Sequence, residues 1–122
     1  MAAKNKAELL TLADQHEAEE ALADIGCSLA GISIMKAKAV FRVVRLHNVS
    51  TKAANIIKQS FLSKGAEAAV SRNAADLSAP VTDVILMGTL HQYRLALSGF
   101  EHQPWGLPAL ALEIKALLSQ QE

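Results

Sequence analysis

Hydrophobic and polar positions change their spacing within one stretch of the chain, residues 81–97. The continuous apolar run Val84–Met87 is typical of a strand that is covered on both faces. Gly88 interrupts the run, and Thr89 is a residue type that caps helices. The apolar residues that follow recur at helical spacing: Leu90, Tyr93 and Leu97. The pattern predicts a central strand, a turn and a helix, which is the unit in which α/β proteins place ligands.

A helix that begins directly after a strand points unpaired backbone N–H groups at its first turn, where they can bind an anion. We therefore take Gly88 and Thr89 as the centre of a candidate ligand site, with His91, Gln92 and Arg72 nearby. The competing interpretation is a plain strand-to-helix turn without a ligand. In either case we expect Gly88 to need a positive φ or a close backbone approach.

The first part of the chain is harder to assign. Asp14 followed by Glu17 has the form of a capping box, so we predict a helix over Gln15–Ile25. Its apolar face would contain Ala18, Ala21, Leu22 and Ile25. This start leaves Leu9–Leu12 outside the helix, and we predict a short strand there. Residues 27–39 alternate only weakly and give no clear prediction.

Strand and helix patterns alternate through the rest of the chain. We predict strands over Val40–Leu46 and Ala66–Ser71, a helix over Thr51–Lys64 between them, a loop over Asn73–Pro80, and a last helix near Pro108. The order predicts an α/β fold, with a small mixed sheet of about four strands and helices packed on it. The length of 122 residues predicts a single domain over residues 1–122.

Composition excludes several classes of partner. Twelve Lys and Arg residues balance twelve Asp and Glu residues, so the chain lacks the basic surface that nucleic acids require. No apolar run approaches the roughly 20 residues of a membrane span, and the amino terminus lacks a signal-peptide pattern. Cys27 is the only cysteine, which fits a reducing compartment. We therefore expect a cytoplasmic protein that contacts neither nucleic acid nor membrane.

No pattern of catalytic or metal-binding residues appears. The four histidines lack the close spacings of a zinc site, and no nucleophile, phosphate-loop or dinucleotide motif is present. We expect no metal, no cofactor and no catalytic residue. Asp83 has two interpretations: a buried carboxylate with a function, or an acid that faces solvent or accepts backbone N–H groups.

Three stretches together resemble one known family: Asn48–Arg72, Thr82–Leu97 and Gln103–Leu118. In this order they are similar to the amino-terminal domain that precedes the catalytic barrel in long forms of bacterial dihydropteroate synthase. The resemblance implies a role in folate and pterin biosynthesis. That synthase joins a pterin pyrophosphate to p-aminobenzoate in a TIM-type barrel, which needs roughly 200 residues or more. No catalytic residue carries over, so the resemblance implies an accessory domain that is not an enzyme on its own.

Two functional hypotheses follow. The first is an association module that forms a homo-oligomer or docks on a dihydropteroate synthase barrel. Leu112, off the apolar stripe of the last helix, and Trp105, in a turn flanked by proline, are its candidate anchors. Trp105 can equally pack on the start of its own helix. The second hypothesis is a module that binds a phosphate- or pterin-like compound at Gly88 and Thr89.

Overall fold

A three-stranded sheet lies at the centre of the fold. The structure is a computed structural model that describes residues 5–120, so residues 1–4 and 121–122 of the predicted domain lie outside it. The strands are β1 (Phe41–Ser50), β2 (Glu67–Val70) and β3 (Val81–Thr89), in the order β1-β3-β2. The predicted α/β class is confirmed, with three strands rather than about four, and both neighbouring pairs are antiparallel rather than mixed.

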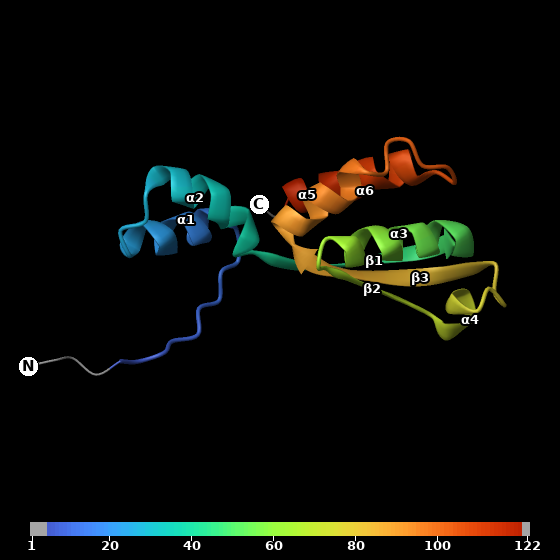
Figure 1. Cartoon of the computed structure of the whole chain (residues 1–122), viewed down its shortest axis with the longest axis horizontal. Coiled ribbons are helices and arrows are strands. Elements are labelled where there is room, and N and C mark those ends of the chain that lie inside the picture. Colours follow the sequence, from blue (N-terminus) through green and yellow to red (C-terminus); the bar gives the residue numbers. More distant parts are fainter. Residues whose placement is uncertain (1–4, 121–122) are drawn as a thin grey trace, which may run out of the picture.

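Because β1 and β2 both run antiparallel to β3, they run parallel to each other. Helix α3 (Thr51–Ser63) connects them, and β3 is inserted between them, which makes a split β-α-β unit. The other helices are α1 (Gln15–Asp24), α2 (Leu29–Met35), the short 3₁₀ helix η1 (Lys36–Lys38), α4 (Arg72–Ala75), α5 (Leu90–Ser98) and α6 (Leu107–Ser119). Figure 1 shows α3, α5 and α6 together on one side of the sheet, with α1 and α2 beyond one end and α4 at the other.

Local capping explains why the predicted helices begin where they do. The Asp14 carboxylate accepts the backbone N–H of Glu17, and the Ser50 hydroxyl accepts that of Ala53. Gly65, at φ +77°, follows α3 in the left-handed conformation that ends helices. The predicted starts of α1 and α3 are confirmed. Ile25, expected on the apolar face of α1, is instead exposed.

The core lies between the sheet and α3, α5 and α6. Strand β3 is central in the sheet, as predicted, and buries alternate residues, among them Val84 and Leu86. Ile85 between them is 37% exposed, so the expectation of a strand covered on both faces is wrong. Helices cover one face only, and on the other face Phe41 and Val43 of β1 are exposed beside Ile85.

Two predictions are wrong: the strand over Leu9–Leu12 and the uninterrupted loop over Asn73–Pro80. Leu9–Leu12 forms no strand, because no other strand of the described residues pairs with it. Residues 73–80 are not entirely loop, since Ser71 caps the one-turn helix α4 over Arg72–Ala75. The undetermined residues 27–39 contain α2, capped by Ser28, and then η1.

The longest helices of the described range, α3 and α6, have 13 residues each. This is short of the roughly 20 residues needed to cross a bilayer. Within residues 5–120 no helix is both long and apolar enough to do so.

Candidate functional site

The predicted ligand turn around Gly88 is built from hydrogen bonds within the chain. Gly88 lies inside β3, and Thr89 caps α5. The Thr89 hydroxyl accepts the Gln92 N–H at 3.1 Å, and the Gln92 side chain accepts the Thr89 N–H at 2.9 Å. The Gln92 amide nitrogen also donates to the Lys64 carbonyl. The turn thus ties the start of α5 to the end of α3.

These bonds determine which donors remain for an anion. The N–H of Leu90 donates to the Val40 carbonyl at 3.0 Å, and the Thr89 and Gln92 N–H groups are paired within the capping box. His91 lies partly buried on the first turn of α5. The structure therefore brings together Gly88, Thr89, His91 and Gln92, and the N–H groups of Thr89, Leu90 and Gln92 are already bonded within the chain.

Arg72 is not part of this group. Val70 pairs with Val84, four residues before Gly88 along β3, and Arg72 continues from Val70 away from Gly88. At about 3.4 Å per residue, the two positions are separated by roughly 20 Å along the sheet. The ligand site stays a prediction, without Arg72 close to its centre.

The expectation for Gly88 holds in one of its two forms. Among residues 5–120 the glycines with positive φ are Gly26, Gly65 and Gly106, so Gly88 does not need this conformation. A Cβ atom at Gly88 would lie 3.1 Å from the Ala66 Cβ and 3.1 Å from the Gln92 Oε1. Close approach of α5 and of the residue before β2 is therefore what favours glycine here.

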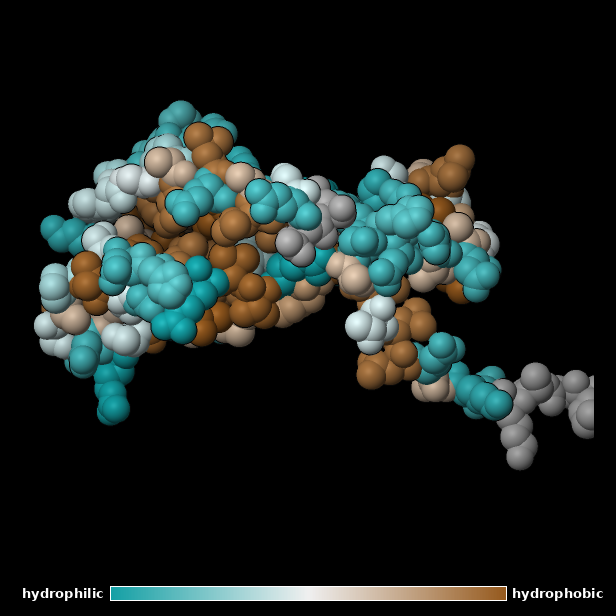
Figure 2. Space-filling model, turned by 180° about the vertical axis from the view of Figure 1, so that it is seen from behind, coloured by the Kyte–Doolittle hydropathy of each residue, from teal (hydrophilic) through white to brown (hydrophobic). Residues whose placement is uncertain are grey.

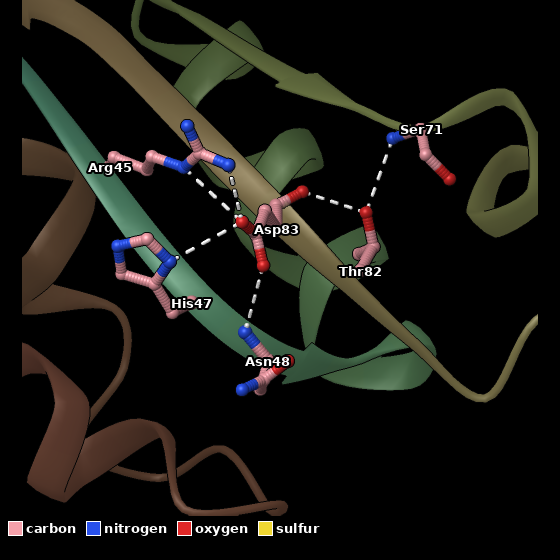
Figure 3. A network of polar contacts seen from close by, with 6 residues as sticks. All are labelled: Arg45, His47, Asn48, Ser71, Thr82 and Asp83. Atoms are coloured by element: carbon pink, nitrogen blue, oxygen red, sulfur yellow. Dashed lines mark hydrogen bonds and ion pairs between the residues drawn. The ribbon is translucent and has the colours of Figure 1, made fainter.

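A polar network that the sequence only partly indicated lies where β1 and β3 pair (Figure 3). The Asp83 carboxylate accepts the Arg45 guanidinium at 2.7 and 3.2 Å and the backbone N–H of Asn48 at 3.1 Å. The His47 Nδ1 lies 3.3 Å from the same carboxylate. Of the two interpretations of Asp83, acceptance of a backbone N–H is confirmed.

The network has a structural role. The β1–β3 register shifts between Leu46 and Val49, and Asn48 adopts φ +54° at this bulge. The hydrogen bonds from Arg45 and from the Asn48 N–H lower the pKa of Asp83 from its ordinary value of 3.8. The carboxylate thus ties β3 to β1 on both sides of the bulge, at Arg45 and at Asn48. Arg45 on a strand, with an acid on its neighbour, was the only sequence signal for this pair.

The two predicted anchors are both exposed. Leu112 is 68% exposed on α6, which confirms that it lies off the buried stripe. Trp105 is half exposed, and the Lys52 ammonium lies 5.7 Å from its ring centroid. This contact links the turn before α6 to the start of α3. A role of either residue in binding a partner stays a prediction.

Titratable side chains are dispersed elsewhere. His16 faces solvent, as its position on α1 predicts, and pairs with Glu20 at 2.6 Å. In the part of the chain that the structure describes, no three His, Cys, Asp or Glu side chains are placed to share a metal ion. Cys27 is partly buried.

Comparison with known proteins relates the chain to two archaeal proteins. It is 31% identical over 105 residues to a probable bifunctional folylpolyglutamate synthase/dihydropteroate synthase of Halobacterium salinarum, which is 86% of this chain and 13% of that protein. A protein of the same description from Haloferax volcanii is 32% identical over 81 residues, 66% of this chain and 9% of that protein. No protein-family model matches the chain. No solved structure matches it either.

These matches confirm the predicted resemblance at a coarse level. The chain is related to a part of proteins whose description includes dihydropteroate synthase, and it spans only a small fraction of their length. The finer resemblance, to the amino-terminal domain of long bacterial synthases, stays a prediction.

Proposed function

We propose that the chain is a non-catalytic association module of the dihydropteroate synthase-related proteins, active in folate biosynthesis in the cytoplasm, and that it binds a second copy of itself along β1. Its relatives support the folate connection. The observation that carries the association is the free edge of β1, a strand of ten residues that pairs with β3 on one side only. The unpaired N–H and C=O groups of a strand edge are a template for another strand.

The hydrogen-bond pattern between β1 and β3 determines which backbone N–H and C=O groups of β1 point to its free edge. Because Leu90 donates its N–H to the Val40 carbonyl, the even-numbered residues that follow at the start of β1 point their backbone groups at β3. Val43 and Arg45 point theirs away from the sheet. By this alternation Val43–Met87 and Arg45–Ile85 are the pairs of the β1–β3 ladder that exchange no backbone hydrogen bonds. A further strand would find their N–H and C=O groups available.

Apolar side chains flank this edge. Val43 is 62% exposed, and Leu117 of α6, which lines the same cavity, is 46% exposed. Val43, Val44, Leu117 and Leu118 line one shallow cavity between β1 and α6, together with Arg42, Arg45 and Gln120. Seen from behind in Figure 2, apolar residues gather over the middle of the larger part of the molecule, with hydrophilic residues around them. We name the exposed backbone of Val43 and Arg45 and this cavity the edge groove.

A second copy suits the edge groove for two reasons. The formal net charge of zero means that two copies do not repel each other at long range. A two-fold interface also counts each apolar contact twice. Burying a fully exposed valine side chain contributes about 1.5–3 kcal/mol. Because Val43 is 62% exposed, a symmetric interface that buries it gains about 1–2 kcal/mol from each copy.

Sedimentation equilibrium at micromolar concentrations tests the proposal. We expect a dimer for the native chain and at least a tenfold weaker association for Val43→Lys, since lysine on an edge opposes strand addition. Leu29→Lys is the matched control, because Leu29 is 86% exposed on α2, away from the sheet. A native chain that is monomeric throughout, or equal effects of the two substitutions, would contradict the proposal.

A parallel experiment asks whether the edge groove takes a synthase instead. The native chain is immobilised, and a barrel-only dihydropteroate synthase is passed over it. Retention that Val43→Lys abolishes and Leu29→Lys preserves, with no self-association of the native chain, would replace the second copy by the barrel as the partner.

A further inference from the structure

An apolar segment without a partner precedes α1. Leu9 is 94% and Leu10 56% exposed, and residues 5–13 belong to no helix or strand. The segment is fixed at its end, because the Ala13 carbonyl accepts the Arg42 guanidinium at the start of β1, and Leu12 packs partly against the core. From there it runs away from the sheet (Figure 1). Covering these two adjacent leucines would remove apolar surface from water and so stabilise an interface.

The structure thus contains two unpaired features. One edge of β1 has no neighbouring strand, and the extended segment before α1 pairs with no sheet. We propose that two copies of the chain exchange the segment Glu8–Thr11, each copy adding it as an antiparallel fourth strand to β1 of the other. This rests on the proposed self-association along β1 and assigns the residues that form it.

Side-chain alternation and charge select one alignment. In an extended segment Glu8 and Leu10 lie on one face and Leu9 on the other. With Leu10 opposite Val43, Glu8 lies opposite Arg45 on the open face of the sheet. The Arg45 side chain is 60% exposed although it binds Asp83, so it retains donors for a second carboxylate. A shift by one residue that places Glu8 opposite Leu46 would put it on the α6 side, where Glu113 lines the same cavity as Leu46 and the two charges repel.

The same alignment covers both leucines. Leu10 adds to the exposed patch beside Val43, and Leu9 lies opposite Val44, toward Leu117 and the cavity of the edge groove. Leu10 opposite Val43 is a hydrogen-bonded pair, because the backbone of Val43 points to the free edge. The predicted strand at Leu9–Leu12 would then exist, for residues 8–11, in the dimer.

The geometry favours exchange over folding back within one chain. To pair with its own β1, the segment would have to leave Ala13 along the sheet, whereas in the structure it runs away from the sheet (Figure 1). In this observed direction the segment can add to the β1 edge of another molecule and not to its own.

Mixed disulfide trapping tests the exchange. In a Cys27→Ser background, one chain carries Leu10→Cys and a second, tagged chain carries Val43→Cys, so that a bond between these two positions must join different molecules. A hydrogen-bonded pair has its Cα atoms about 5.5 Å apart, which permits a disulfide. We expect a covalent heterodimer under mild oxidation. The control pairs Leu10→Cys with Ile85→Cys, which lies on the same open face but on β3. Equal yields for both pairs would overturn the exchange.

A second measurement separates this inference from the proposed function. Sedimentation of the double variant Leu9→Asp/Leu10→Asp should show at least a tenfold weaker dimer, whereas Leu29→Asp should match the native chain. A dimer that the double variant leaves intact overturns the exchange and keeps the association. A monomeric native chain overturns both. A monomer of the Leu10→Cys/Val43→Cys double variant with an internal disulfide overturns the exchange in favour of folding back.

Discussion

Replacing Gly88 by valine is expected to lower the free energy of unfolding by about 1–3 kcal/mol, the usual cost of forcing extra atoms into a packed site. The added Cβ would lie 3.1 Å from the Ala66 Cβ and from the Gln92 Oε1. Gln92 can yield only by loosening its bond to the Thr89 N–H, which caps α5. Losing a capping bond costs about 0.5–2 kcal/mol, and the higher strand propensity of valine returns at most about 1 kcal/mol.

Urea denaturation followed by circular dichroism measures this difference. With a denaturant slope of roughly 1–3 kcal/mol per molar, the midpoint should fall by about 1 M. The matched control uses alanine at two glycines. Gly88→Ala should destabilise, whereas Gly99→Ala should not, because Gly99 has φ −79° and a Cβ there would meet nothing closer than 3.6 Å.

A double-mutant cycle identifies the contact that matters. If Gln92 carries the cost, Gly88→Ala should destabilise the Gln92→Ala variant less than it destabilises the native chain. An unchanged midpoint for Gly88→Val, with an unchanged slope, would refute the reasoning from close approach.

Three further outcomes are expected. Because the pKa of Asp83 is lowered on folding, its ionised form contributes stability that is complete above pH 3.8 and is lost as the pH falls through the lower folded value; the difference in urea midpoint between the native chain and Asp83→Asn should therefore shrink below pH 4, and a constant difference would contradict this. Burial raises the pKa of Tyr93, the one tyrosine of the chain, above its usual 10, so its ultraviolet titration should be delayed until alkaline unfolding, and a reversible transition near pH 10 in the folded protein would count against it. The purified chain should not convert pterin pyrophosphate and p-aminobenzoate, since no TIM-type barrel is present in the described fold; turnover above background would refute the non-catalytic assignment.

The sequence predicted the features that depend on interactions between residues close together in the chain. Thr89, Ser50 and Asp14 cap their helices as their residue types predict, because each bond joins residues three positions apart. The Gln92 half of the box at Thr89 emerged only from the structure. The buried residues of α3, among them Ala54, Ile57 and Phe61, recur at the 3.6-residue period of a helix. The same local logic identified Gly88 as constrained. It could not identify the Ala66 Cβ as the atom that a side chain at position 88 would contact, since that contact depends on how β2 and α5 pack.

The sequence could not predict which apolar residues are buried by another element of the fold. The run Val84–Met87 indicated a strand buried on both faces, yet helices cover only one, and Ile85 stays exposed. The candidate site had the same difficulty, because Arg72 is near Gly88 in neither sequence nor space once β2 runs antiparallel to β3.

Leu9–Leu12 illustrates how a wrong prediction for one chain becomes informative about two. Its apolar composition is that of a strand, and a strand needs a partner that residues 5–120 of a single chain do not supply to it. The ten-residue strand β1 has the reciprocal deficiency, with one edge unpaired and Val43 exposed. Each feature alone would be an ordinary irregularity of a small protein. Together they are the basis of the proposed exchange, in which Glu8 lies opposite Arg45 and a second copy of the chain supplies the missing strand to each β1.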